Sequence, residues 1–178
     1  DLNGSITGVG MLPTSWLAVP FSDPNCLANN ASGATPDLTD LTGPLSTNGI
    51  NGNPYSGTTF VSGLDVLGTT TYHEGIMQSV SGFSVGCVYT VNFQQAVVKQ
   101  NNLLDTSGSW SVYIDNTLVG TSIPTASQAL PGSNAFIWQP RSVSFTATNV
   151  SHSIKFLPTD DDPAKTATQG LRMGIDSI

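Results

Sequence analysis

After residue 74 the sequence is dominated by short runs in which apolar and polar side chains alternate, and turn-forming residues separate one run from the next. Alternation with a period of two places the apolar side chains on one face of a β-strand. Short strands at this spacing, bounded by Gly, Asn, Asp and Ser, are typical of β-sandwiches. The sequence therefore predicts an all-β fold, a β-sandwich of the jelly-roll type. The runs are residues 75–80, 88–98, 110–114, 117–120, 141–147, 153–157 and 171–178.

The stretch WSVYIDNTLVG is the best hairpin signal in the chain. Asp115 and Asn116 separate its two runs, and both residue types tolerate the positive φ that a tight hairpin turn requires. In the first run Trp110 and Ile114 share one face, whereas Tyr113 points to the other. We therefore assign Trp110 to the core and Tyr113 to a surface.

The stretch SGFSVGCVYTVNF predicts a loop, which contains Gly82 and Gly86, followed by a strand with two different faces. One face is apolar and the other is polar, and in a sandwich the polar face meets solvent or a ligand. The apolar face carries Tyr89, Val91 and Phe93, and the polar face carries Thr90, Asn92 and Gln94.

The first 55 residues are rich in Gly, Pro, Asn and Asp, and we expect a loop-rich segment there. Charged residues make up only 10% of the chain, which contains 18 Gly and 11 Pro, and this composition disfavours long helices. No internal repeat or low-complexity tail divides the sequence. We therefore predict a single domain that covers residues 1–178.

The charge and hydropathy of the chain argue against two classes of partner. The formal net charge is −7 and only five residues are Lys or Arg, so no basic surface is available to neutralise the phosphates of a nucleic acid. No stretch approaches the roughly 20 apolar residues that a membrane-spanning helix needs. We therefore expect neither nucleic-acid binding nor membrane insertion.

Cys26 and Cys87 are an even pair, which suits an oxidising compartment. If they are oxidised, we expect a disulfide that joins the N-terminal segment to the strand beginning near Cys87. Two buried thiols are the open alternative. Neither cysteine belongs to a CxxC motif or lies beside a histidine, so we do not expect a zinc site.

Four segments follow one another along the chain: EGIMQSVSGFSVGCVYTVNF, GSWSVYIDNTLVGTS, WQPRSVSFTATNVSHSIKFL and GIDSI. In this order they resemble the galactose-binding-like jelly rolls, which include carbohydrate-binding modules of the family 4 type and DUF642-like domains of secreted multidomain proteins. The resemblance covers roughly residues 58–178. It implies a non-catalytic carbohydrate-binding or adhesion module of a secreted or cell-surface bacterial protein, monomeric within a larger chain, whose partner is a polysaccharide or a cell-surface glycan.

The same resemblance implies a structural calcium ion, because in these modules calcium often joins the first strand to the last. It nominates Asp176 of the final GIDSI together with oxygen atoms around Asn3 and Ser5. Ca2+ takes about six to eight oxygen ligands, many of them backbone carbonyls that leave no trace in a sequence. Thr7 stands where many members have glutamate, so no ligand is assigned there.

The stretch YHEG holds one of the two histidines of the chain beside its only glutamate. It is not the HExxH motif of a zinc protease, because Met77 stands in place of the second histidine and Gly75 opposes a helix. No GxSxG motif supplies a serine nucleophile either. We expect His73 and Glu74 to face a ligand, to anchor a loop, or to lie plainly at a strand edge.

Sugars are held by aromatic rings and by side chains that bond hydroxyl groups, and both kinds occur near the predicted strand ends. The acidic stretch Asp160, Asp161 and Asp162 is open to three roles: a solvated turn, a calcium site or a ligand contact. With Glu74 it also keeps a glycosidase in consideration. We expect a non-catalytic binding module, with a structural spacer or a polysaccharide-degrading enzyme as alternatives. The predicted carbohydrate-binding residues are Tyr72, His73, Glu74, Tyr113, Trp138 and Arg141.

Overall fold

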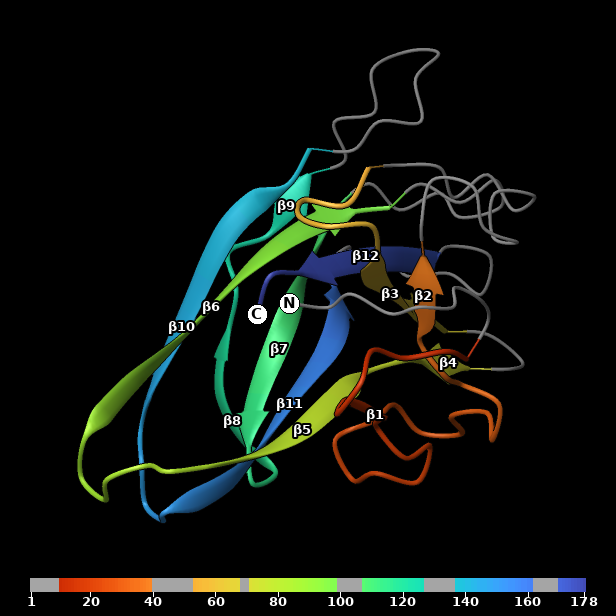
Figure 1. Ribbon diagram of the computed structural model, residues 1–178. Helices are drawn as coiled ribbons and strands as arrows, with labels where there is room; N and C mark the ends of the chain where they lie inside the picture. The colour runs from red at the N-terminus through yellow and green to blue at the C-terminus, as the bar shows by residue number, and fades with distance from the viewer. Residues whose placement is uncertain (1–9, 40–52, 68–70, 99–106, 127–136, 162–169) are drawn as a thin grey trace.

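The computed structural model describes residues 10–39, 53–67, 71–98, 107–126, 137–161 and 170–178. All twelve elements in these ranges are β-strands, and they form two sheets of six strands each (Figure 1). Every strand pair within the sheets is antiparallel. Among the described residues, no helix has the length and apolarity that crossing a membrane requires.

Neighbouring strands in each sheet come from distant parts of the chain. Sheet I has the order β1-β5-β11-β7-β8 with β9 paired to β7, and sheet II has the order β10-β6-β12-β3-β2 with β4 paired to β3. Sheet I contains β1 (Leu17–Ala18), β5 (Ile76–Ser81), β7 (Ser107–Ile114), β8 (Thr117–Thr121), β9 (Thr125–Ala126) and β11 (Ser151–Asp160). Sheet II contains β2 (Asp37–Thr39), β3 (Phe60–Val66), β4 (Tyr72–His73), β6 (Val88–Val97), β10 (Gln139–Thr146) and β12 (Gly170–Asp176).

The all-β sandwich predicted from alternation is confirmed. Each of the seven predicted runs coincides with one of the strands β5, β6, β7, β8, β10, β11 and β12. The structure also contains strands that alternation did not predict. The longest of these is β3, with the sequence FVSGLDV, which is covered on both faces and therefore does not alternate. Strand β2 lies in the N-terminal segment that we expected to consist of loops.

The main core lies between the two sheets. Trp110 is fully buried there, as predicted, and its Nε1 donates a hydrogen bond to the carbonyl oxygen of Gly174 at 3.1 Å. Phe93 of sheet II and Phe156 of sheet I meet edge to face, with their ring centroids 5.3 Å apart. Large side chains from both sheets therefore fill one continuous apolar layer.

A second, smaller apolar cluster lies on the outer face of sheet II. Phe60 and Gly174 lie on the opposite face of their strands from the core residues Val61 and Ile175, because successive side chains in a strand alternate. The ring of Trp138 packs against Phe60 there, with the centroids 5.3 Å apart. A Cβ atom at Gly174 would lie 3.1 Å from the Trp138 ring, so the glycine makes room for it.

The predicted turns are present. Asp115 and Asn116 have φ values of 48° and 71° and join β7 to β8, which confirms the hairpin. Gly82 and Gly86, in the connection from β5 to β6, have φ values of 98° and 86°. At these two positions a residue with a side chain would be strained.

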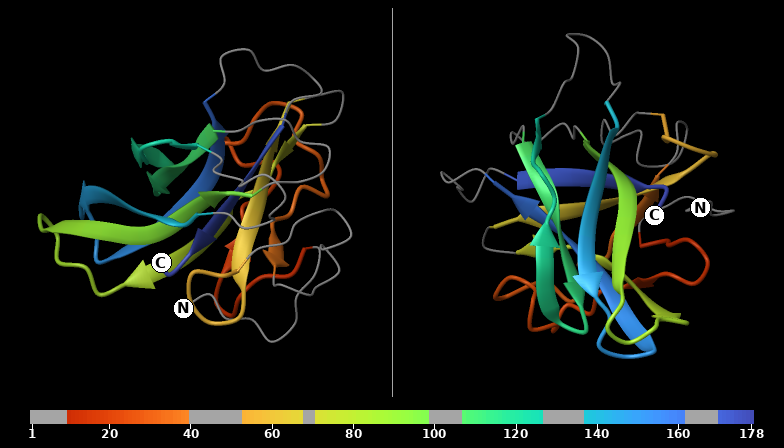
Figure 2. Two further views of the ribbon diagram at one scale, coloured as in Figure 1. Left: turned by 90° about the horizontal axis from the view of Figure 1, so that it is seen from above. Right: turned by 90° about the vertical axis from the view of Figure 1, so that its left-hand side faces the viewer.

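Strands β6 and β10 continue as a two-stranded ribbon beyond the end of β12 (Figure 1, Figure 2). Strand β10 pairs with β6 from Val88 to Gln95, whereas β12 meets β6 only from Gln94 onward. Within the described part of the chain, the edge of β6 from Val88 to Phe93 therefore has no strand beside it on the β12 side. This exposed edge positions the site described below.

Candidate binding site

The structure buries the YHEG stretch instead of presenting it at the surface. Tyr72 is half-buried and His73 is 6% exposed. Nδ1 of His73 accepts a hydrogen bond from the backbone N–H of Leu27 at 3.1 Å, so the ring proton lies on Nε2, which donates to the carbonyl oxygen of Pro158 at 2.8 Å. His73 thus anchors the N-terminal segment, which is one of the roles expected from the sequence.

Glu74 is also buried, with 5% of its surface exposed. Its Oε2 accepts a hydrogen bond from the backbone N–H of Leu64 at 3.0 Å. Burial raises the pKa of Glu74 to about 8, although nearby Arg172 acts in the opposite direction. Nη1 of Arg172 already lies 2.8 Å from Oδ2 of Asp37, so Glu74 has to share its counterion. This position gives Glu74 little contact with any surface ligand.

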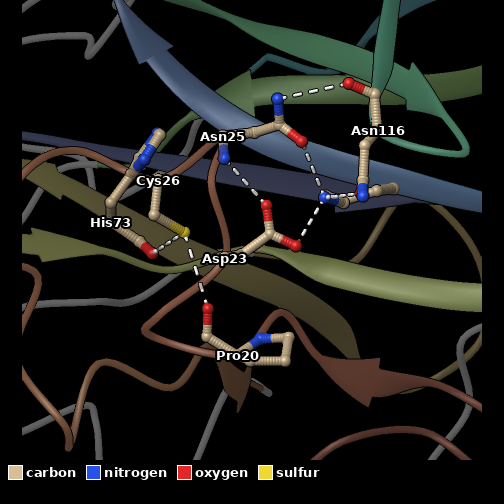
Figure 3. Close-up of polar contacts among 7 residues, drawn as sticks. Pro20, Asp23, Asn25, Cys26, His73 and Asn116 are labelled. Atoms are coloured by element: carbon tan, nitrogen blue, oxygen red, sulfur yellow. Dashed lines mark hydrogen bonds and ion pairs between the residues drawn. The ribbon is translucent and has the colours of Figure 1, made fainter.

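A buried lysine of sheet I bonds Asp23 and Asn25 of the N-terminal segment, both of which Figure 3 labels. Lys155 of β11 is 1% exposed, and its Nζ lies 2.6 Å from Oδ2 of Asp23. The side-chain oxygens of Asn25 and Asn116 lie 2.9 and 2.8 Å from the same nitrogen. An ammonium group has three N–H donors, so all of them are satisfied. Tyr113 borders this cluster, with its ring centroid 5.6 Å from Nζ, and its burial raises its pKa.

Trp138 and Arg141 each hold a loop in place. Nε1 of Trp138 donates a hydrogen bond to the carbonyl oxygen of Asn53 at 2.7 Å. Nε of Arg141 donates to the carbonyl oxygen of Ile123 at 2.8 Å, and Nη2 donates to the hydroxyl of Thr125 at 2.9 Å. Of the six predicted sugar-binding residues, His73, Trp138 and Arg141 thus bond three different loop segments, and Glu74 is buried against β3.

The predicted calcium ligands are described only in part, since Asn3 and Ser5 lie outside the described residues. Asp176 is 1% exposed. Its Oδ2 accepts a hydrogen bond from the backbone N–H of Ser56 at 3.0 Å, and its Oδ1 accepts one from Ser177 at 2.7 Å. In the part of the chain that the structure describes, no three His, Cys, Asp or Glu side chains gather closely enough to hold a metal ion.

The acidic stretch after β11 is divided by the structure. Asp160 is the last residue of β11 and is 8% exposed, so it is not part of the solvated turn that was one of the expected roles. Its backbone N–H donates to Oδ2 of Asp65 at 2.8 Å. Oδ2 of Asp161 accepts a hydrogen bond from the hydroxyl of Ser107 at 2.9 Å. Asp162 lies outside the described residues.

Both cysteines are free thiols, so the structure does not contain the predicted disulfide. The Sγ atom of Cys26 lies between the carbonyl oxygens of Pro20 and His73, at 3.8 and 3.9 Å (Figure 3). Burial raises the pKa of the Cys26 thiol to about 11. Cys87 is exposed in the connection from β5 to β6, which lies at the far end of the β6–β10 ribbon from the N-terminal segment (Figure 1). Their separation in the fold explains why they do not pair.

A groove of about 380 Å3 opens along the exposed edge of β6. We call it the Phe83 groove. It brings together the start of β6, the connection before it and the residues that follow β12. The residues that line it are Phe83, Tyr89, Thr90, Val91, Asn92, Phe145, Ile154, Ser177 and Ile178.

One wall of the Phe83 groove is aromatic. The rings of Phe83 and Tyr89 meet edge to face, with their centroids 4.8 Å apart, and Phe145 supports Phe83 at 5.6 Å. The hydroxyl of Tyr89 accepts a hydrogen bond from the backbone N–H of Ser84 at 2.8 Å, which holds the ring in position. Phe83 and Tyr89 are both partly exposed, so their rings are accessible to a ligand.

The rest of the described lining combines the aliphatic Val91, Ile154 and Ile178 with three uncharged polar side chains. Thr90 and Asn92 are exposed, and Ser177 lies beside them at the end of β12. None of the nine lining residues is an Asp, Glu, His, Lys, Arg or Cys. The alternation within β6 had singled out Tyr89 and the polar face of Thr90 and Asn92, but no pattern had pointed to Phe83 or Ser177.

The second histidine is engaged within the protein in the same way as the first. Nε2 of His152 accepts hydrogen bonds from the backbone N–H groups of Thr148 and Asn149 at 3.2 and 3.1 Å. The proton of the neutral ring therefore lies on Nδ1, which donates to Oδ2 of Asp115 at 2.5 Å. Neither histidine of the chain thus has a ring nitrogen available as a general base.

Comparison with solved structures finds similarity to adhesin domains. The K2 cleaved adhesin domain of Lys-gingipain matches with 12% identity and a TM-score of 0.53, over 97% of this chain and 90% of that chain. The K1 domain, from Porphyromonas gingivalis W83, matches with 13% identity and a TM-score of 0.54, over 93% and 89% of the two chains. The K3 domain matches with 14% identity and a TM-score of 0.50, over 92% and 89%.

Identities this low show a shared β-sandwich fold and no more. No protein-family model matches the chain, and no curated protein sequence does either. The resemblance to family 4 and DUF642-like domains therefore stays a prediction.

Proposed function

We propose that this chain is a non-catalytic carbohydrate-binding module of a secreted or cell-surface protein, and that it binds a neutral glycan in the Phe83 groove. The observation that carries the proposal is the lining of that groove. Among the residues that the structure describes, it combines two accessible aromatic rings with hydroxyl and carboxamide side chains and contains no Asp, Glu, His, Lys, Arg or Cys. Rings stack on the apolar faces of sugars, and uncharged polar groups bond their hydroxyls.

Two further observations support a binding role over a catalytic one. Both histidines use both ring nitrogens in hydrogen bonds within the protein. Three structures that share the fold over more than nine-tenths of this chain are named as adhesin domains. A module of this kind acts by attaching its parent protein to a surface, which agrees with an extracellular location.

A glycan array of neutral oligosaccharides tests the proposal, followed by titration calorimetry with the best ligand and prolonged incubation with it. We expect binding without turnover. Absence of binding to every glycan would favour a structural spacer, and release of a shortened sugar would show an enzyme.

Asn92→Ala is expected to weaken binding of that ligand about tenfold, because it removes one exposed carboxamide from the groove and leaves the core intact. Ser142→Ala is the matched control, since Ser142 pairs with Asn92 across the ribbon and lies outside the groove lining. Calorimetry on both variants checks this prediction. Equal affinities of the two variants would place the glycan elsewhere.

We also propose that a structural calcium ion binds near Asp176, as the resemblance to the jelly-roll family implies. Calcium at 100 times its Kd would add about 2.7 kcal/mol of stability, which raises the melting temperature by about 5 to 10 °C. Asp176→Asn should abolish the rise. Thermal melts of a calcium-loaded sample, recorded with added calcium and with excess chelator, test this proposal. Identical melting curves in the two conditions would contradict it.

A further inference from the structure

A second groove, of about 350 Å3, lies on the opposite side of the β6–β10 ribbon. It opens between β8 and β10, which are edge strands of the two sheets, and we call it the Asp115 groove. Apolar side chains form its floor and hydroxyl groups form its rim. The floor consists of Ile114, Val119 and Phe145, and the rim consists of Thr117, Ser144, Thr146 and Thr148.

Asp115 is the one charged residue in this lining. Its side chain is 48% exposed, although Oδ1 accepts a hydrogen bond from the backbone N–H of Ser153 at 2.8 Å and Oδ2 accepts one from His152. Burial acts to raise the pKa of Asp115, but the hydrogen bonds from Ser153 and His152, together with the electrostatic effect of His152, outweigh it and lower the pKa below its ordinary value. The carboxylate is therefore charged at neutral pH.

Among the described residues, His152 is the one titratable side chain paired with the Asp115 carboxylate, and the lysine and arginine side chains are engaged elsewhere. Nε2 of His152 accepts two backbone hydrogen bonds, so the ring reaches Asp115 through a single donor at Nδ1. Lys155 is bonded to Asp23, and Arg172 to Asp37. The guanidinium of Arg141 bonds carbonyl, hydroxyl and carboxamide oxygens. In the part of the chain that the structure describes, the exposed Asp115 carboxylate thus borders an apolar floor and has no lysine or arginine partner.

We propose that the Asp115 groove binds a lysine side chain of a partner protein. The apolar floor matches the aliphatic stem of lysine, and the carboxylate with the hydroxyl rim matches its three N–H donors. A guanidinium fits less well, because its parallel pair of hydrogen bonds needs both carboxylate oxygens, and each of them already accepts a bond. The proposal does not depend on glycan binding in the Phe83 groove.

The test is a titration of isotope-labelled protein, followed by NMR, with four probes: Nα-acetyl-lysine amide, the matching arginine and norleucine amides, and glucosamine. We expect the lysine probe to shift the amide signals of Asp115, Thr117 and Val119 and to bind about tenfold more tightly than the norleucine probe. Equal binding of lysine and norleucine would overturn the proposal. Preference for arginine or for glucosamine would overturn it as well.

Two variants locate the binding. Asp115→Asn should weaken lysine binding about tenfold, whereas Asp161→Asn makes the same charge change at another exposed carboxylate and should leave binding unchanged. Thr117→Lys leaves the bonds of Asp115 alone and supplies a competing ammonium at the rim, so it should also weaken binding. That variant decides the question if Asp115→Asn disturbs the turn. Wild-type affinity in Thr117→Lys would contradict the proposal.

Discussion

Replacement of Asp23 by alanine is expected to lower the free energy of unfolding by about 3 kcal/mol, because it leaves the ammonium of Lys155 buried without its counterion. Lys155 is 1% exposed, so water cannot readily take the place of the lost carboxylate. The oxygens of Asn25 and Asn116 remain within 3 Å of Nζ, but they carry no charge. The loss thus comes mainly from one buried, unpaired charge.

Urea unfolding of the wild type and Asp23→Ala measures this difference. Lys155→Met removes the buried charge itself and is expected to cost less, since an apolar side chain of similar length replaces the pair at little or no cost in many proteins. Asp161→Asn is the surface control and should change stability by less than about 0.5 kcal/mol. A cost for Asp23→Ala as small as that of the control would show that the ion pair is not important for stability.

This cluster also explains how the N-terminal segment is held. Between β1 and β2 the segment forms turns and an isolated bridge from Asn30 to Thr71 instead of strands. Its attachment therefore relies on side chains: Asp23 and Asn25 bond Lys155 in β11, and the backbone of Leu27 bonds His73 in β4. Buried polar bonds of this kind fix one arrangement of a segment that has few apolar anchors.

The sequence predicts most of the fold because strands with one covered face alternate. Strand β10 is an example, since Val143 and Phe145 are buried between exposed neighbours. The same rule fails for β3, whose two faces are both covered, one by the core and one by Trp138 and its cluster. No local pattern reveals that second covering, because it arises from packing between residues far apart in the sequence.

The candidate site was less predictable than the fold. Residue type made His73 and Glu74 conspicuous, but residue type does not reveal burial, and both face the interior. The Phe83 groove exists because β12 ends at Asp176 and, within the described part of the chain, leaves the first half of β6 without a strand on that side. The relative lengths and register of paired strands produce that edge, and neither follows from composition or alternation.

The burial of Glu74 leads to the second large prediction. Its pKa lies at about 8 in the folded protein and near 4.5 in the unfolded chain, so between these values the folded state binds more protons than the unfolded state. The stability linked to Glu74 is therefore fully present below about pH 4.5 and is lost as the pH rises through 8. From pH 5 to pH 8 the wild type should lose about 3 kcal/mol from this group.

Glu74→Gln isolates that effect, because the amide does not titrate but keeps an oxygen that can accept the hydrogen bond from Leu64. Urea unfolding of both proteins at several pH values between 5 and 8 is the measurement. All other titrating groups are common to the two proteins and largely cancel in the difference. We expect the variant to gain on the wild type by about 3 kcal/mol across this range. Parallel stability profiles would show instead that Arg172, although paired with Asp37, also keeps Glu74 charged in the folded protein.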